Sequence, residues 1–530
     1  MKKRLLWVVG AFTVSTWAAC NCGHQAGTTC SSTSDCGAGL ACISNICSLS
    51  DGGPPGDGGP PGDGGPGNPD GGDGGCVNLE CQQVSCPGGG TTTLTGTVYD
   101  PSGQVPLYNA MVYVPNGQTL PFTPGVTCDR CGAVTSGSPL VITLTGADGK
   151  FSLDNVPTGN NIPLVIQIGR WRRQVTIPSV PACTSTPITD VNLVRMPRNK
   201  SEGDIPQMAI ASGSADPFEC LLRKMGISDS EFTLPTGNGR IHYYVANGIN
   251  MSPPAPADTT LWSDAGTLRN YDIVLLPCEG GEHLKPSYAT QNIIDYTSAG
   301  GRVFTTHYGY VWIYGNAGNP VQSPFPSTGT WQPQSCDSYS TPLPVTVDQT
   351  FPKGASFAQW LVNVGASTTA GTLTLIESRH DLFQTDGGAQ QWLYTNIGSC
   401  STNPPAVEHM TFNTPLNPPN QSDGGAGLQC GRVVYSDFHV SAAALADGGG
   451  TFPTSCKVTA LTPQEKALVF MLFDVSSCIQ ADSAPPTVCA GVRQTCSATN
   501  PCCNGLVCKA SSGAVCSSTD TGCRCGALLN

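Results

Sequence analysis

Histidine and carboxylate residues follow several apolar, strand-like runs in the second half of the chain. His307 comes directly after the run "RVFTT", and Asp437 and His439 come after the run "GRVVYS". Glu279 follows the run "DIVLLP" after a single intervening residue. Groups of this kind can transfer protons where they meet, and two imidazoles with a carboxylate could hold a divalent metal ion. These four residues are therefore the candidates for catalytic side chains.

A cysteine, Cys278, lies between the same apolar run and Glu279. Glu282 and His283 follow closely, and a nearby imidazole could lower the pKa of the Cys278 thiol and make it a nucleophile. In an oxidising compartment, however, a cysteine is more simply explained as half of a disulfide. We expect Cys278 to form a disulfide, with Cys220 as a candidate partner.

Buried strands and helices alternate from residue 200 to about residue 480. The runs "QMAIASG" and "YDIVLLP" have the continuous apolar character of strands that are covered on both faces. The run "PSYATQNIIDYTSAGG" predicts a helix that ends at its two glycines, and Thr462, Pro463 and Glu465 predict the capped start of a closing helix. This alternation predicts a flavodoxin-like open α/β sheet, in which the candidate residues would share one edge.

Three segments of this region also carry a resemblance to a known family. In order, "YDIVLLPCEGG", "NIIDYTSAGGRVFTTHYG" and "GRVVYSDFHVS" resemble the class I glutamine amidotransferase-like superfamily, especially its trehalose-utilisation-type relatives. The resemblance implies a nucleophile elbow, Gly-x-Cys-x-Gly, at the second segment, where this chain has His307 in place of the cysteine. His439 matches the catalytic histidine, but Val440 and Ser441 replace the Pro-Glu that follows it. The resemblance therefore implies the scaffold without its glutamine-hydrolysing triad.

The preceding region, residues 76–199, reads as a series of short strands separated by turns. Asp148-Gly149 marks a hairpin, and regular short strands of this kind predict a β-sandwich. The runs "GTVYDPSG", "AMVYVPN" and "ADGKFSLDNVPTG" resemble the carboxypeptidase regulatory-like domain, a small prealbumin-like sandwich. The resemblance implies a stabilising, spacing or binding role, and no HxxE zinc motif of a peptidase accompanies it.

The 27 cysteines of the chain indicate an oxidising compartment and many disulfides. Five of them fall between residues 22 and 47, in a small stapled module. Eight more fall in the last segment, whose spacing resembles knottin or colipase-like disulfide modules and whose pairing the sequence leaves open. These candidates are Cys489, Cys496, Cys502, Cys503, Cys508, Cys516, Cys523 and Cys525.

The N-terminus has the organisation of an export signal. Three basic residues precede the apolar run "LLWVVGAFTV", which is too short to span a bilayer comfortably. The following "WAAC" resembles a bacterial lipobox, and the resemblance implies that Cys20 is lipidated and becomes the new N-terminus. Ordinary signal cleavage near Ala19 remains an alternative. The Asp-, Gly- and Pro-rich stretch at 51–75 predicts a flexible, acidic spacer.

These features predict a multidomain chain with a β-sandwich, a flavodoxin-like open sheet and small disulfide-rich modules at both ends. The net charge of −12 and the lack of a basic cluster argue against a nucleic-acid partner. No cofactor is predicted, although a divalent metal could bind the histidines. The predicted segments are a signal peptide at 1–19, a lipidated module at 20–50, the linker at 51–75, the sandwich at 76–199, the α/β domain at 200–482 and a disulfide module at 483–530.

Two functions are consistent with this organisation. The favoured one is a cell-surface binding or structural protein of the cell envelope. It would be either anchored at the outer membrane by an N-terminal lipid or secreted. Its α/β domain would be catalytically degenerate, and its ligand would be a surface polysaccharide or protein. The alternative is an exported hydrolase that uses His307, His439 and nearby carboxylates on a carbohydrate-derived substrate. A separation of more than about 10 Å between the two imidazoles would exclude the second function.

Overall fold

The computed structural model describes the backbone of 40–43 and 46–49 and then most of the chain from residue 76 to residue 527. Gaps fall at 334–341, 398–404, 419–427, 441–449, 458, 491–493, 497–500, 503–505, 511, 518–519 and 521. The chain divides into two units, Met1–Gly74 and Gly75–Asn530. The predicted signal peptide, Cys20, the linker and Cys503 lie outside the described residues. None of the described helices combines the length and the apolar character needed to cross a membrane.

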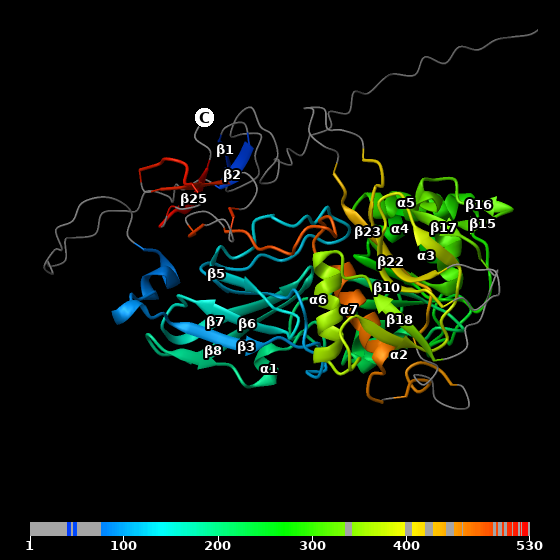
Figure 1. Ribbon diagram of the computed structural model, residues 1–530, viewed down its shortest axis with the longest axis horizontal. Coiled ribbons are helices and arrows are strands. Elements are labelled where there is room, and N and C mark those ends of the chain that lie inside the picture. The colour runs from blue at the N-terminus through cyan, green and yellow to red at the C-terminus, as the bar shows by residue number, and fades with distance from the viewer. Residues whose placement is uncertain are drawn as a thin grey trace, which may run out of the picture. The chain divides into compact units, whose positions relative to one another are not determined.

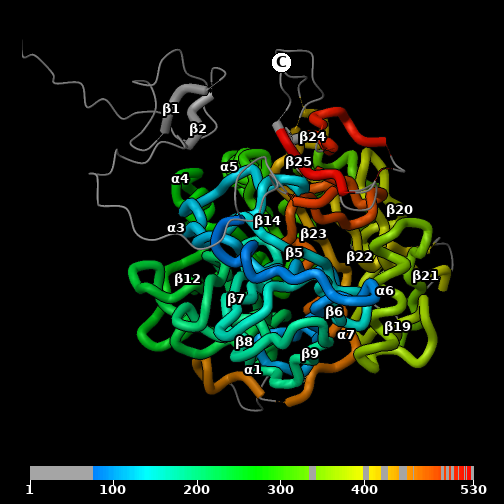
Figure 2. Tube along the Cα trace, turned by 90° about the vertical axis from the view of Figure 1, so that its left-hand side faces the viewer, coloured from blue at the N-terminus to red at the C-terminus, as the bar shows by residue number. Residues whose placement is uncertain are grey.

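The first unit contributes one antiparallel pair of strands, β1 (Leu40–Ile43) and β2 (Ile46–Leu49). The second unit begins with two small sheets that carry the predicted short strands. Strands β5, β7 and β8 of the larger sheet are seen from the sandwich side in Figure 2. Alternate side chains of both sheets, among them Leu94, Val112, Phe151 and Leu164, fill a common core. The smaller sheet is β6 (Lys150–Asp154), β3 (Thr93–Thr97) and β9 (Ser185–Pro187), and the larger is β5 (Pro139–Leu144), β4 (Met111–Pro115), β7 (Gly159–Ile168) and β8 (Trp171–Val180), with the short helix α1 (Val191–Val194) after β9.

A ten-stranded mixed sheet forms the centre of the second unit. Six strands run parallel, in the order β11 (Phe232–Thr233), β12 (Ile241–Val245), β10 (Met208–Ser212), β13 (Ile273–Leu276), β14 (Arg302–Thr306) and β23 (Gly431–Ser436). Four antiparallel strands continue it: β22 (Ala406–Thr414), β21 (Gln390–Thr395), β18 (Leu343–Val347) and β19 (Thr372–Leu375). The alternation of strands and helices did not predict this antiparallel half. No described helix separates β21 from β22, which pair antiparallel as neighbours in sequence, whereas β18 and β19 pair antiparallel although α6 (Pro352–Asn363) lies between them.

Helices cover both faces of this sheet. Successive side chains of its strands point to opposite faces and are buried on both, so each face needs a covering layer. Ile210, Leu275 and Phe304 pack with α2 (Phe218–Lys224), α6 (Pro352–Asn363) and α7 (Pro463–Ser476), in the same core as the sandwich. Val274 and Val303 point to the other face and pack with α3 (Thr259–Trp262), α4 (Ala265–Leu268) and α5 (Ser287–Ser298). In Figure 1, α6 and α7 stand between the sandwich and the sheet. The remaining pairs of short strands are β15 (Gly315–Asn316) with β16 (Asn319–Pro320), β17 (Gly329–Trp331) with β20 (Leu382–Thr385), and β24 (Leu506–Lys509) with β25 (Arg524–Ala527).

The closing helix α7 begins where its sequence predicts. The Thr462 hydroxyl accepts a hydrogen bond from the Glu465 backbone N–H, and the Glu465 carboxylate accepts one from the Thr462 N–H. Pro463 occupies the first turn, where it sacrifices no intrahelical hydrogen bond. The Glu465 carboxylate also pairs with buried Lys224 of α2 at 2.7 Å, so that the cap joins the two helices.

Disulfides tie distant parts of the second unit together. Cys128 bonds to Cys430 and Cys131 bonds to Cys478, which joins the β4–β5 connection to both ends of the β23–α7 segment. Of the C-terminal candidates, Cys496 pairs with Cys508, Cys502 with Cys525 and Cys516 with Cys523, and Cys489 is also disulfide-bonded. The remaining described bridges are Cys76–Cys81, Cys86–Cys183 and Cys220–Cys456.

The expected disulfide between Cys220 and Cys278 is wrong. Cys220 lies on α2 in the core that this helix shares with α7, and there it bonds to Cys456. Cys278 follows β13 at the edge of the sheet, where its side chain contacts His307, and its thiol is free.

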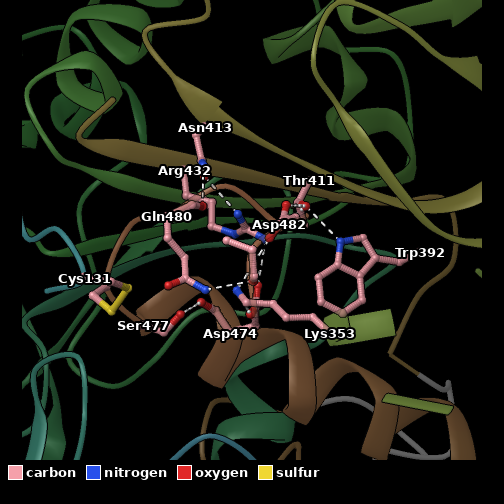
Figure 3. A network of polar contacts seen from close by, with 12 residues as sticks. Cys131, Lys353, Trp392, Thr411, Asn413, Arg432, Asp474, Ser477, Gln480 and Asp482 are labelled. Atoms are coloured by element: carbon pink, nitrogen blue, oxygen red, sulfur yellow. Dashed lines mark hydrogen bonds and ion pairs between the residues drawn. A yellow bond between two sulfur atoms is a disulfide. The ribbon is translucent and has the colours of Figure 1, made fainter. Parts of the chain in front are cut away.

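A buried network of charges connects α6, α7 and the sheet (Figure 3). Arg432 of β23 contacts the carboxylates of Asp474 at 2.9 Å and Asp482 at 2.8 Å, and Lys353 of α6 contacts Asp474 at 2.7 Å. These four side chains are no more than 7% exposed. Burial alone would raise the pKa of Asp474, but Lys353 and Arg432 lower it to about 2. The network therefore depends on the presence of both cations.

Glu219 on α2 is a buried acid, and it should make the stability of the fold depend on pH. Burial raises its pKa to about 8, above the ordinary value of 4.5. The contribution of neutral Glu219 to the free energy of unfolding is then complete below pH 4.5. It decreases by about 1.4 kcal/mol per pH unit between pH 4.5 and 8 and is lost as the pH rises through 8.

Replacing Glu219 by Gln should remove this loss. Urea unfolding at pH 5 and pH 8 should show a smaller decrease in the free energy of unfolding for Glu219→Gln than for the unchanged chain. The exposed Asp295→Asn serves as the control and should keep the original pH dependence. Identical pH dependence in all three proteins would contradict the expectation.

Candidate functional site

The candidate side chains gather at the carboxyl edge of the parallel strands. Cys278 follows β13, His307 follows β14, and His439 follows β23. The strands β13, β14 and β23 are adjacent and parallel, so that the residues just beyond them lie side by side. All three side chains are buried, with exposed fractions of 0%, 2% and 4% in this order.

One imidazole nitrogen of His307 lies at the centre of the group. Its Nδ1 is 3.1 Å from Nε2 of His439 and 3.3 Å from Sγ of Cys278. Its other nitrogen, Nε2, is 3.5 Å from Oδ2 of Asp381. The two imidazoles are thus in direct contact, far inside the 10 Å that would have excluded a shared function.

The backbone turns sharply at His307, as it leaves β14 for a 3₁₀ turn at His307–Trp312. His307 has a φ of 38°, in the left-handed region that a non-glycine residue rarely adopts. The Tyr435 hydroxyl lies 3.2 Å from the His307 carbonyl and 2.9 Å from Asp437, so its single proton is shared between these two acceptors. A Cβ at Gly309 would collide with the Thr305 hydroxyl, so the turn needs glycine at that position. The elbow geometry is present, with an imidazole in place of a thiol.

Asp216 links the ends of three strands, although no local sequence pattern marks it as a site residue. Its carboxylate accepts hydrogen bonds from the Thr306 hydroxyl at 2.5 Å and from the Val440 N–H at 2.7 Å. Thr306 in turn accepts from the Cys278 N–H at 2.9 Å. Asp216 therefore joins the neighbours of His307 and His439 directly, and it reaches Cys278 through Thr306.

The two carboxylates selected from the sequence do not face the imidazoles. Asp437 accepts from the Tyr435 hydroxyl at 2.9 Å and from the Asp381 N–H at 2.7 Å, so it supports the loop that carries Asp381. Glu279 accepts from Lys285 at 2.6 Å and from Asn247 at 2.8 Å. The Glu279 carboxylate is thus engaged by Lys285 and Asn247, whereas the side chain of the neighbouring Cys278 contacts His307.

Burial keeps the members of the site uncharged. It lowers the pKa of His307 to about 2, with the charges of His439 and Arg379 adding to the effect, and lowers the pKa of His439 to about 3. It also raises the pKa of the Cys278 thiol to about 12. A thiolate–imidazolium pair, which activates the nucleophile of a cysteine hydrolase, is therefore disfavoured here. Neutral imidazoles and a cysteine are metal ligands, since a bound metal displaces the thiol proton, which is released to solvent.

Further buried acids surround the group and were missed at the level of sequence. Glu408 lies on β22, next to the site, and burial with the nearby charges of Asp437 and Asp381 raises its pKa well above the ordinary value. A signal was available for Glu408 and His409, which form a charged and polar pair within the run "AVEHMTF", and both are buried in β22. For Asp381, which lies in the connection between β19 and β20, no local pattern marks a role.

Comparison with known proteins provides no family assignment. No protein-family model matches the chain, and no curated protein matches it. Among solved structures, a putative ThuA-like protein from Bacteroides uniformis is 10% identical and aligns with a TM-score of 0.27 over 50% of this chain and 90% of its own. A cytoplasmic protein from Salmonella typhimurium is 12% identical, with a TM-score of 0.26 over 51% and 99%. The N-terminal domain of mmIFT52 is 8% identical, with a TM-score of 0.28 over 51% and 97%. Similarities at this level carry no argument about activity.

Proposed function

We propose that this chain is an exported, lipid-anchored protein of the cell envelope, which binds a surface polysaccharide or protein and has no amidotransferase activity. The observation that carries the proposal is the elbow after β14. There His307 stands where an amidotransferase has its cysteine, and its Nδ1 contacts His439 at 3.1 Å. The histidine that would activate a nucleophile therefore meets a second imidazole.

The order of the parallel strands supports the flavodoxin-like part of this proposal. Apart from the two-residue edge strand β11, the parallel strands lie in the order β12-β10-β13-β14-β23, which are second, first, third, fourth and fifth along the chain, as in flavodoxin-like sheets. The two small sheets before it support the prealbumin-like sandwich. In this proposal the sandwich and the open sheet present their ligand as one body, because they share a core and two disulfides.

The lipid anchor can be tested directly on cells. Radioactive palmitate should label the chain, and Cys20→Ala should abolish the label while leaving the protein detectable by antibody. Equal labelling of both proteins would rule out the anchor at this position. The described disulfides support the export that such an anchor requires.

The loss of amidotransferase activity leads to a second expected result. The purified protein should release no ammonia from glutamine above the rate of a His307→Gln variant. A rate that depends on His307 or Cys278 would contradict the degenerate assignment. The Cys278→Ser variant completes the comparison, because Cys278 is the free thiol in the described part of the chain.

An exported hydrolase that uses His307, His439 and nearby carboxylates remains a second candidate, and the position of Asp381, 3.5 Å from Nε2 of His307, favours it. In this candidate the Asp381 carboxylate orients the His307 imidazole, which serves as a general base for water. A panel of chromogenic esters and glycosides should show hydrolysis that His307→Gln abolishes and the remote His242→Gln leaves unchanged. Absence of hydrolysis across the panel, with the protein folded, would remove this candidate in favour of the binding function.

A further inference from the structure

Three potential metal ligands converge at the carboxyl edge of the ten-stranded sheet, each from a different strand end. Sγ of Cys278, Nδ1 of His307 and Nε2 of His439 are atoms that all lie within 4.8 Å of one another. We propose that these three side chains bind one transition-metal ion that accepts thiolate and imidazole ligands, such as zinc. The proposal goes beyond the envelope function and does not depend on the lipid anchor.

The distances between the donor atoms fit a tetrahedral ion. Zinc lies about 2.3 Å from sulfur and about 2.0–2.1 Å from nitrogen, which places two nitrogen ligands about 3.3 Å apart and sulfur about 3.6 Å from nitrogen. The observed separations are 3.1 Å between the imidazole nitrogens and 3.3 Å between Sγ and Nδ1. Shifts of a few tenths of an ångström would therefore complete the coordination.

Hydrogen bonding alone leaves this arrangement incompletely satisfied. The in-plane position at Nδ1 of a neutral His307 holds either one proton or one lone pair. Both the Cys278 sulfur and the His439 nitrogen lie within hydrogen-bond distance of that single position. One proton or one lone pair can make a well-directed bond to only one of them. An ion between the three atoms accepts a lone pair from each at the same time.

The far side of the His307 ring has the partner that metal-binding histidines generally have. Its Nε2 faces Asp381 at 3.5 Å, and a proton held there leaves the Nδ1 lone pair free for the ion. Asp381 is itself supported by its N–H bond to the Asp437 carboxylate. Gln464 of α7 donates to the His439 carbonyl at 2.7 Å and fixes that ligand from the opposite side. Asp381 and Gln464 are thus positioning residues.

The surroundings can compensate the charge of the ion. A bound Cys278 would supply a thiolate, and Asp216, Asp381 and Asp437 are buried close to the three ligands. Arg379, next to these groups, is the opposing cation. Three protein ligands leave a fourth position for water or another ligand, as in zinc sites that act on substrates. Soft thiolate and imidazole donors also exclude calcium and magnesium, which prefer oxygen.

Zinc binding to the full mature chain tests the proposal. The protein is stripped with a chelator, its disulfides left intact, and titrated with zinc chloride against a chromophoric chelator. We expect one zinc ion per chain, with an affinity that Cys278→Ser and His439→Gln each reduce at least tenfold. We expect Asp381→Asn to weaken binding by about 10–100-fold. The matched control is His242→Gln, a half-buried histidine of β12 whose ring contacts Tyr271, and it should bind as the unchanged chain does.

Cobalt(II) provides a readout on the unchanged chain itself, so the test stands even where a variant fails to fold. Cobalt(II) bound to the unchanged chain should give the near-ultraviolet thiolate-to-cobalt band, and Cys278→Ser should lose it. Zinc affinity that is the same in Cys278→Ser and His439→Gln as in the unchanged chain would overturn the proposal. Absence of the thiolate band from cobalt-treated unchanged protein would overturn it as well, even if the variants fail to fold.

Discussion

Replacing Arg432 by Met should lower the free energy of unfolding by about 3–5 kcal/mol, because it leaves two carboxylates buried against a single cation. Arg432 contacts Asp474 and Asp482 within 3 Å, and its Nη1 also donates to the Asn413 side chain. After the substitution, Lys353 alone would face both acids. Met has a similar volume, so the loss reflects charge and hydrogen bonding more than a cavity.

Urea unfolding at neutral pH measures this effect, and Lys150→Met is the control. Lys150 pairs with Asp148 in an exposed hairpin of the sandwich, where the side chains are 70% and 43% exposed. Exposed pairs of this kind contribute between zero and 1 kcal/mol. Arg432→Lys, which keeps the charge but loses the forked geometry, should lie between the two. A loss for Arg432→Met no larger than that of the control would show that the network does not stabilise the fold.

Two disulfides join the β4–β5 connection to the rest of the unit. Removing both should lower the free energy of unfolding by more than the sum of the losses caused by removing each one alone. With one bridge intact, the other closes a loop of only about 50 residues, made of 128–131 and 430–478. With neither intact, the first bridge to form closes a loop of about 110–120 residues, because the intact bridge Cys220–Cys456 shortens the path between its two ends. The roughly twofold difference in loop length is worth about 0.7 kcal/mol.

Three variants test this non-additivity by chemical unfolding. Replacement of the pair Cys128 and Cys430 by Ala, or of the pair Cys131 and Cys478, should each cost about 2–4 kcal/mol. The fourfold replacement should exceed their sum by about 0.7 kcal/mol. The matched control is the local bridge Cys76–Cys81, which closes only 5 residues and should matter least. An additive or smaller loss in the fourfold variant would argue that chain entropy is not the source of the stabilisation.

The elements that local sequence determines were predictable. The cap of α7 depends on three neighbouring residues, Thr462, Pro463 and Glu465, and their side chains specify the start of the helix by themselves. The position of the candidate residues at one edge also followed from their place after apolar strands. That His307 and His439 lie at adjacent strand ends follows from the direct pairing of β14 with β23, although 132 residues separate them in sequence.

Interactions set by long-range packing could not be predicted. Asp381 faces His307 because the loop after β19 bonds to the segment after β23, through the Arg379 N–H and the Asp437 carbonyl. Nothing near Asp381 in sequence encodes that contact. The fate of Cys278 was misjudged for the same reason. The number of cysteines favours a disulfide on average, whereas the actual partner depends on which face of the sheet each cysteine occupies.

The two bridges at Cys128 and Cys131 also determine when this protein can be finished during biosynthesis. A chain is made from its N-terminus, and both cysteines emerge in the sequence Cys-Asp-Arg-Cys some three hundred residues before their partners. Throughout that interval they exist as thiols or in some temporary bond. The native pairing therefore waits for nearly the whole chain, and a thiol–disulfide exchange catalyst would still be needed at this early segment late in synthesis.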